Sequence, residues 1–189
     1  MTPRRMRPKT LPALLAVAVI SGLQLPVLSA ESNGSPADAG GSCSYDRAKY
    51  LALDYQTFDQ TPNRGWRDLA AGDKCLAEAA DLIRDYRTTN NLPHPMLFWH
   101  EGQLRALNGS VSQAIPLMEM SRPLAAGISG WNEYVDVTVA FLRKDRAAYD
   151  KARAALAAIP KAPYLGVVDR LGQCFGNSYK QSYRACEKQ

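Results

Sequence analysis

The sequence holds few of the residues and motifs that usually mark catalytic or metal sites. Only two histidines occur, His94 and His100, and their spacing does not match the His-Glu-x-x-His motif of zinc proteases. The chain has no Gly-x-Ser-x-Gly nucleophile motif, no Cys-x-x-Cys pair and no glycine-rich phosphate loop. These absences argue against zinc-dependent, serine-dependent and nucleotide-dependent enzymes, and we expect neither a cofactor nor a metal.

A basic surface for nucleic acid is also missing once the N-terminal segment is set aside. The whole chain carries a net charge of +5, but residues 1–30 hold four of its 23 basic residues and none of its 18 acidic ones. The rest carries 19 basic and 18 acidic side chains, without a basic run. Nucleic-acid-binding domains usually concentrate basic residues on one face. We therefore expect no nucleic-acid partner and no polybasic membrane surface.

Residues 1–30 have the pattern of a secretory signal peptide. Four basic residues precede a largely apolar run from Leu11 to Leu28, and the small residues Ser29 and Ala30 follow it. Serine, glycine, glutamine and proline interrupt the run, whereas a membrane anchor needs about 20 consecutive apolar residues. We expect export with cleavage after Ala30, a periplasmic or extracellular location, and no stable membrane insertion after cleavage.

The remaining chain suits a short linker followed by one domain. Residues 31–44 are rich in glycine, proline and small polar residues, which predicts a flexible linker, and residues 45–189 are enough for a single domain. All four cysteines follow the signal segment, and an even number in an exported chain predicts two disulfides. We favour Cys43–Cys75 and Cys174–Cys186, because the members of each pair are close in sequence. Four cysteines nevertheless allow three pairings.

Strand patterns are missing from residues 45–189, and helical patterns take their place. Alternating runs of Val, Ile and Thr between turns do not occur, whereas apolar residues recur at helical spacing, most clearly after Trp131. Antiparallel helix pairs of this kind leave an apolar face that the next pair covers. The sequence therefore predicts an all-α fold of stacked antiparallel helix pairs. The expected helices span residues 46–58, 66–71, 72–88, 95–107, 112–120, 131–143, 146–159, 165–175 and 179–186.

Within residues 95–122, small residues at Gly102, Gly109 and Ala114 and a large apolar residue at Met118 recur at a spacing that resembles one unit of the tetratricopeptide-repeat family. That family has small residues where two helices of a unit approach closely and a large apolar residue between them. With Gly102 at the eighth position, the matching residues fall at positions 8, 15, 20, 24 and 27 of the unit: Gly102, Gly109, Ala114, Met118 and Ser121. The chain departs from the family at Phe98, Glu101 and Arg105, where Trp, Leu and Tyr are usual.

The flanking segments 66–90 and 131–159 share the helix–turn–helix shape but not the full family pattern. The chain is thus similar to a degenerate tetratricopeptide-like array. The resemblance implies a right-handed stack of helix pairs and, more loosely, a surface that binds a protein or peptide. A fold alone does not establish a function, because one fold serves many sites.

Six residues in two of the expected helices are candidates for a binding surface. Trp and Tyr are typical anchors of interfaces, and His next to Glu is able to perform acid–base chemistry. The alternative for the aromatic residues is packing in the core, and the alternative for His100 is a partly buried hydrogen-bonding role. The carboxylate pair Asp54 and Asp59 fits a solvated helix face better than a glycosidase site. The six candidates are Trp99, His100, Glu101, Trp131, Asn132 and Tyr134.

The sequence therefore predicts an exported helical-repeat protein that binds an unknown protein or peptide and is not an enzyme. One alternative is a small secreted hydrolase that uses His100 and Glu101. The other is a secreted inhibitor or effector.

Overall fold

Helices account for all of the regular structure in residues 43–186, the residues that the computed structural model describes. The expected all-α fold is therefore confirmed for this part of the chain. The expected signal peptide and residues 31–42 of the expected linker lie outside the described residues. The α-helices are α1 (Arg47–Leu51), α2 (Trp66–Leu69), α3 (Leu76–Thr89), α4 (Pro95–Leu107), α5 (Val111–Glu119), α6 (Trp131–Leu142), α7 (Arg146–Ala157), α8 (Leu165–Gln173) and α9 (Tyr179–Ala185). Shorter helical turns are η1 (Gln56–Gln60), η2 (Ala71–Asp73) and η3 (Arg122–Ala126).

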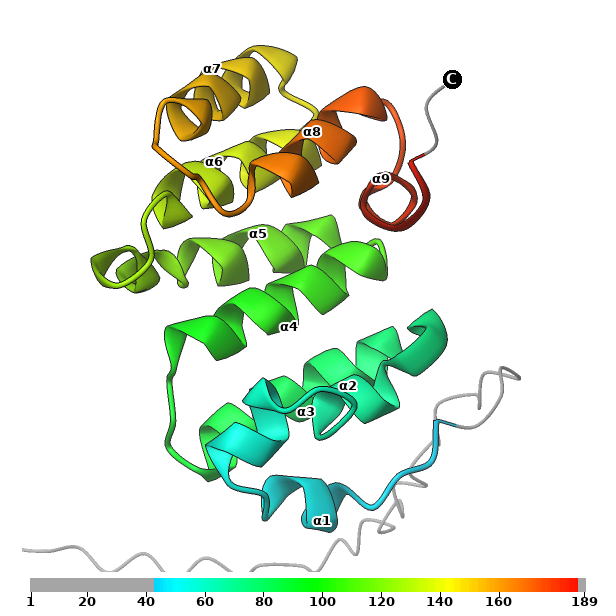
Figure 1. Cartoon of the computed structure of the whole chain (residues 1–189). Coiled ribbons are helices and arrows are strands. Elements are labelled where there is room, and N and C mark those ends of the chain that lie inside the picture. Colours follow the sequence, from blue (N-terminus) through cyan, green and yellow to red (C-terminus); the bar gives the residue numbers. More distant parts are fainter. Residues whose placement is uncertain (1–42, 187–189) are drawn as a thin grey trace, which may run out of the picture. The chain divides into compact units, whose positions relative to one another are not determined.

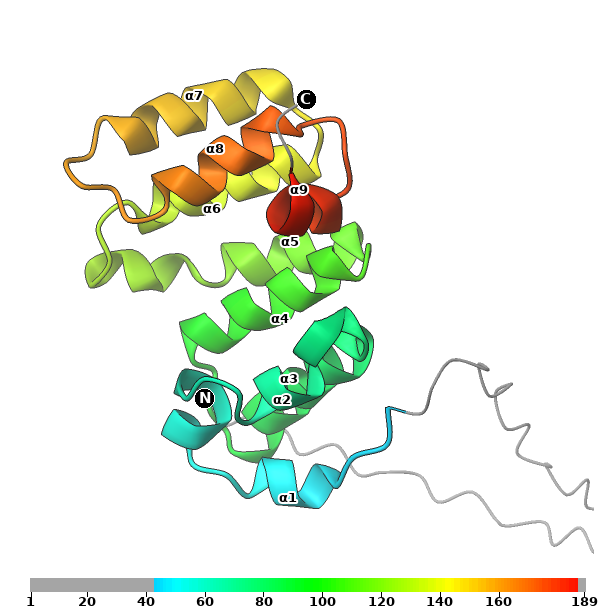
Figure 2. The same cartoon turned by 45° about the vertical axis from the view of Figure 1, so that its right-hand side comes forward.

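The helices from α3 to α7 stack on one another in chain order (Figure 1). Short turns reverse the chain between neighbours, and Gly109 and Lys144 in two of these turns have positive φ angles of 83° and 58°. Helix α8 packs on α6, and α9 packs on α4. The last helix is therefore brought back beside the middle of the stack, as Figure 2 shows. This return places α9 next to α4, whose residues precede it by 72 positions or more in the sequence.

One apolar core runs through the stack. Each long helix turns an apolar stripe toward its neighbours, and burial of these side chains is the main favourable contribution to folding. Within residues 43–186, no helix is both long enough and apolar enough to cross a membrane. The largest fully buried core residues include Phe58, Leu82, Ile83, Leu97, Met118, Val135, Phe141, Tyr149, Leu156 and Leu171.

Helices α4 and α5 approach each other closely at Gly102. A Cβ atom at this position would lie 2.9 Å from Cγ of Met118 and 3.1 Å from the carbonyl oxygen of Ala114. Both of these residues are fully buried. The small-residue requirement that the tetratricopeptide resemblance implies at Gly102 is therefore explained by this contact, while the repeat arrangement of the whole stack stays a prediction.

The prediction of one helix over residues 46–58 is wrong. Helix α1 ends at Leu51, and a separate π-helical turn, η1, begins at Gln56. The carboxylate of Asp54 accepts hydrogen bonds from the backbone N–H and the hydroxyl of Thr57, at 2.9 and 2.8 Å. Such local bonds compete with a continuous helix and start a new turn. The break has a structural consequence, because η1 directs Asp59 into the interior.

Both predicted disulfides are confirmed. Cys43 is bonded to Cys75 at the start of α3, and Cys174, after α8, is bonded to Cys186, after α9. The Cα–Cα distances are 5.7 and 5.9 Å. Disulfides of this kind are typical of oxidising compartments. The pair Cys174–Cys186 fixes both ends of α9, and Cys43–Cys75 holds the segment before α1 against α3.

Candidate functional site

The candidate site is built around a buried carboxylate, that of Asp59. Its side chain is wholly buried, so the expectation that it lies on a solvated face is wrong. Asp59 is within 2.7 Å of His100 Nδ1 and accepts hydrogen bonds from the indole Nε1 of Trp66 at 2.8 Å and the amide of Gln60 at 2.5 Å. The guanidinium of Arg67 is 3.9 Å from the carboxylate of Asp59. It also donates a hydrogen bond to the backbone carbonyl oxygen of Asp59.

These neighbours keep the Asp59 carboxylate charged. Burial alone raises the pKa of a carboxyl group because it penalises the ionised form. In Asp59 the hydrogen bond and charge of His100 oppose this effect, followed by the hydrogen bond of Trp66 and the charge of Arg67. Together they hold the pKa of Asp59 below its ordinary value. The carboxylate is therefore ionised at neutral pH and acts only as an acceptor.

Glycine 65 explains how Trp66 reaches this carboxylate. Gly65 has a positive φ of 55°, and a Cβ atom there would lie 1.9 Å from the carbonyl oxygen of Phe58. Only glycine fits such a close approach of two backbone segments. The contact brings the start of α2 directly against η1. As a result, the indole of Trp66 lies within hydrogen-bonding distance of Asp59 and packs against the ring of His100, with ring centroids 5.1 Å apart.

The two ring nitrogens of His100 differ: Nδ1 is hydrogen-bonded to Asp59, and Nε2 is available for another hydrogen bond. Because an ionised carboxylate only accepts, Nδ1 carries the proton and donates it, which leaves a lone pair on Nε2 of the neutral ring. Within residues 43–186, no hydrogen bond reaches Nε2, and it is not among the buried polar atoms that lack a partner. His100 also lines a surface cleft, and Nε2 is its ring nitrogen that remains for a hydrogen bond with a bound molecule.

The second histidine, His94, belongs to the same polar network. The Nδ1 atom of His94 accepts from the backbone N–H of Met96 at 3.2 Å, so it accepts the hydroxyl proton of Tyr55 at 3.1 Å. That hydroxyl accepts in turn from the amide of Gln60, which also donates to Asp59. Burial, followed by the charge of Asp59, raises the pKa of Tyr55 to about 12. Side chains of the η1 region thus connect both histidines.

The cleft at His100 has a volume of about 660 Å³ and is formed by α2, η2, α4 and α9. Leu104 and Leu107 of α4 provide apolar surface, and the amide of Gln103 provides a polar group. On the α9 side, Arg184 pairs with Asp73 at 3.1 Å. The cleft therefore combines a small apolar surface with several polar and charged groups.

The charges that line the cleft are largely balanced. Arg67 lies against the negative charge of Asp59, and its guanidinium stacks on the ring of Trp66 at 4.2 Å from the centroid. Arg184 is paired with Asp73, which Lys180 also approaches at 3.8 Å. A cleft with each arginine already paired presents little net charge to a ligand.

Glu101 lies away from His100, although the two are adjacent in sequence. Consecutive helical residues point in different directions. The carboxylate of Glu101 is buried and forms ion pairs with Arg87 and with Arg105, the latter at 3.6 Å. The Arg87 guanidinium also stacks on Phe98, 4.0 Å from the ring centroid. The structure thus brings His100 together with Asp59 and not with Glu101.

Three of the aromatic candidates are buried between helices. The ring of Trp99 lies 5.0 Å from that of Trp131 and 4.9 Å from that of Tyr134. The indole of Trp131 donates to the carbonyl oxygen of Ser121 at 3.0 Å. Packing in the core accounts for this cluster. Asn132 is partly buried, and its Oδ1 atom has no hydrogen-bond partner in the described part of the chain.

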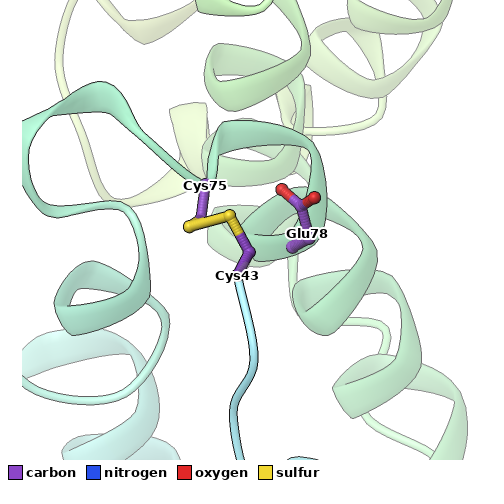
Figure 3. Close-up of side chains that lie close together, drawn as sticks. All are labelled: Cys43, Cys75 and Glu78. Carbon is purple, nitrogen blue, oxygen red and sulfur yellow. A yellow bond between two sulfur atoms is a disulfide. The ribbon is translucent and has the colours of Figure 1, made fainter. Parts of the chain in front are cut away.

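Figure 3 shows a group of potential metal ligands elsewhere, formed by Cys43, Cys75 and Glu78. Their ligand atoms lie within 4.8 Å of one another. The two sulfur atoms are bonded in a disulfide, however, and cysteine binds metals as a thiolate. Among the described residues this is the sole group of three such side chains, and it does not offer a free thiolate.

Several residues of the site could not be assigned from the sequence. Asp59 is 41 residues from His100, and no spacing rule relates an irregular turn to a distant helix. Trp66 and Arg67 directly follow Gly65, and this glycine is the one local sign in the sequence of a close backbone contact. No family model, curated protein or solved structure matches the chain. Functional proposals therefore rest on its own residues.

Proposed function

We propose that this protein is an exported helical-repeat binding module that holds a peptide segment of another protein in the cleft at His100. Export to the periplasm or beyond is supported by the signal-peptide pattern and by the two disulfides. The tetratricopeptide resemblance of residues 95–122 supports a stack that binds peptides. No cofactor is needed for such a function.

The observation that carries this proposal is the composition of the cleft. Its 660 Å³ accommodate a few amino-acid side chains, and its lining comes from segments that are distant in sequence. Apolar surface from Leu104 and Leu107 favours an apolar side chain, while Gln103 and Nε2 of His100 are available for polar contacts. Rigid walls that need little reordering on binding favour affinity.

Site-specific photo-cross-linking tests this proposal. A photoreactive amino acid replaces Ala71, an exposed residue at the cleft, and in a matched control it replaces Ala154, an exposed residue of α7 away from it. We expect the mature protein, mixed with exported proteins of its source cell, to cross-link one partner from position 71 only. A synthetic peptide from the cross-linked segment should then bind, and Arg67→Gln should weaken it. Equal cross-linking from both positions, or a peptide that does not bind, contradicts the proposal.

A second candidate function is hydrolysis, and the Asp59–His100 contact favours it. A carboxylate that fixes the tautomer and orientation of an imidazole is a recurrent element of acid–base catalysis. In the hydrolase alternative derived from the sequence, Glu101 was the partner of His100, and Asp59 takes that place here. The two candidate functions use the same cleft and differ in whether the bound molecule is changed.

A further inference from the structure

We propose that the cleft hydrolyses small carboxylic esters by direct attack of water, with His100 as the catalytic general base and Asp59 as the residue that positions it. This inference rests on the second candidate function, hydrolysis, and specifies its nucleophile and its substrate class. It does not depend on peptide binding.

The geometry around His100 identifies it as the general base. The 2.7 Å contact from Nδ1 to a wholly buried carboxylate fixes the ring of His100 and leaves the Nε2 lone pair without a hydrogen bond, on a residue that lines the cleft. The carboxylate is itself held by Trp66 and Gln60, so it cannot rotate away from the imidazole. When Nε2 takes a proton, the negative charge of Asp59 stabilises the imidazolium that forms. A merely structural histidine needs no ring nitrogen that is left without a hydrogen bond.

Water is assigned as the nucleophile because the cleft lining contains no serine, threonine or cysteine. The four cysteines of the chain are all paired in disulfides. The one hydroxyl in the lining belongs to Tyr183, and a protonated phenol is a poor nucleophile toward an ester. A covalent acyl intermediate is therefore not expected.

The substrate class follows from the charge and polarity of the walls. Arg67 and Arg184, the two cationic residues of the lining, are each paired with a carboxylate, which weakens them as binders of a phosphate group. A neutral ester suits such a balanced cleft, and Leu104 and Leu107 offer surface for a short acyl chain. The guanidinium of Arg67 uses one nitrogen on the Asp59 carbonyl, and its other N–H groups and the amide of Gln103 are donors for a developing oxyanion.

The proposed reaction consumes one water per ester. The water oxygen forms a bond to the acyl carbon while one of its protons passes to Nε2 of His100, and the carbonyl oxygen becomes an oxyanion. The oxyanion then reforms the carbonyl, the bond to the alcohol oxygen breaks, and that oxygen takes the proton from Nε2. The products are a carboxylic acid and an alcohol, and the imidazole returns to its starting form.

The test uses the disulfide-bonded mature chain with p-nitrophenyl acetate and p-nitrophenyl butyrate as probes. General-base catalysis typically contributes about 100-fold or more, so His100→Gln should lower kcat/KM by at least about 100-fold. Asp59→Asn should lower kcat and also move the pH at which activity rises, which a purely structural residue would not do. Asp169→Asn, in an ion pair with Arg153 outside the cleft lining, is the matched control for Asp59→Asn, and we expect no more than a small change in kcat/KM. Circular dichroism checks that each variant is folded.

The outcomes separate the inference from the function on which it rests. If the wild-type protein is no faster than an equal concentration of free imidazole toward both the carboxylic esters and p-nitrophenyl phosphate, hydrolysis itself is refuted, and this comparison needs no variant to fold. If the esters are hydrolysed with a stoichiometric burst and an acyl mass adduct, hydrolysis stands but direct water attack is wrong. If p-nitrophenyl phosphate is cleaved and the carboxylic esters are not, the substrate class is wrong.

Discussion

Asp59 holds the candidate site together because one carboxylate accepts from three side chains that come from different segments. Gln60 lies in η1, Trp66 begins α2, and His100 lies in α4. A buried carboxylate is tolerated only when its acceptor positions are filled and a counter-charge is near, and Arg67 supplies that charge. Stability and site geometry therefore depend on the same residue.

Removal of this carboxylate should be strongly destabilising. Asp59→Ala leaves the buried indole N–H of Trp66 without its acceptor, and loss of one partner of a buried charged network costs about 3–5 kcal/mol. Asp169→Ala is the control, since Asp169 forms an exposed ion pair with Arg153, and such pairs contribute less than about 1 kcal/mol. Urea denaturation of both variants measures the two changes. Equal losses would contradict the assigned importance of Asp59.

The pKa of Asp59 predicts how its contribution depends on pH. Because the pKa is lower in the folded state, the unfolded chain binds a proton at a higher pH than the folded one does. The contribution of Asp59 to the free energy of unfolding is therefore complete above the ordinary value of 3.8 and is lost as the pH falls through the folded-state pKa. We expect the stability difference between wild type and Asp59→Asn to shrink as the pH falls below about 4. A constant difference down to pH 2 would contradict this.

At the scale of single elements, local signals predicted some helices well and others poorly. Helix α4 occupies the expected residues 95–107, because Pro95 fits a first helical turn and Asn108-Gly109 fits an end. The break between α1 and η1 was not predicted, because the apolar residues on both sides suggested one helix. The hydrogen bonds from Thr57 to the Asp54 carboxylate favour two separate helical segments over one continuous helix. Whether these bonds form depends on the packing of the turn that follows.

The contact of α4 with α5 predicts opposite effects for one substitution at two helical glycines. Gly166 in α8 has open space around a would-be Cβ atom, so Gly166→Ala should raise stability by about 0.5–1 kcal/mol through helix propensity. Gly102→Ala places the same methyl group against Met118 and the Ala114 carbonyl, and overpacking of this kind costs about 1–3 kcal/mol. Thermal unfolding should show a higher Tm for the first variant and a lower one for the second. A higher Tm for both variants would show that α4 and α5 move apart easily to accommodate the added methyl group.

At the scale of the whole described chain, the two disulfides fix different parts of the stack. The disulfide Cys43–Cys75 lies at the N-terminal part of the stack and spans 32 residues. The disulfide Cys174–Cys186 spans 12 residues and encloses α9. Both were predictable from sequence proximity. The contact of α9 with the cleft was not, because Asp73 and Arg184 are 111 residues apart and share no repeat pattern. Long-range contacts of this kind depend on the full packing of the stack.

Removal of each disulfide should therefore loosen a different region. In the Cys174→Ala/Cys186→Ala variant, amides of residues 179–185 should exchange faster with D₂O, because α9 loses its covalent closure, while those of α3 stay protected. The Cys43→Ala/Cys75→Ala variant should show the reverse pattern. The Cys43→Ala/Cys75→Ala variant should lose more stability than the other, because closure of a longer loop contributes more. Each loss should be about 2–4 kcal/mol. Identical exchange patterns would mean that α9 is held by its other contacts.

Nitrogen-15 NMR of the imidazole tests whether Asp59 orients His100. At pH 8 we expect a proton on Nδ1 of His100 and none on Nε2, because the ionised carboxylate 2.7 Å away only accepts. In Asp59→Asn this preference should be lost. A proton on Nε2 in the wild-type protein, or a tautomer that is unaffected by Asp59→Asn, would show that Asp59 does not orient the ring.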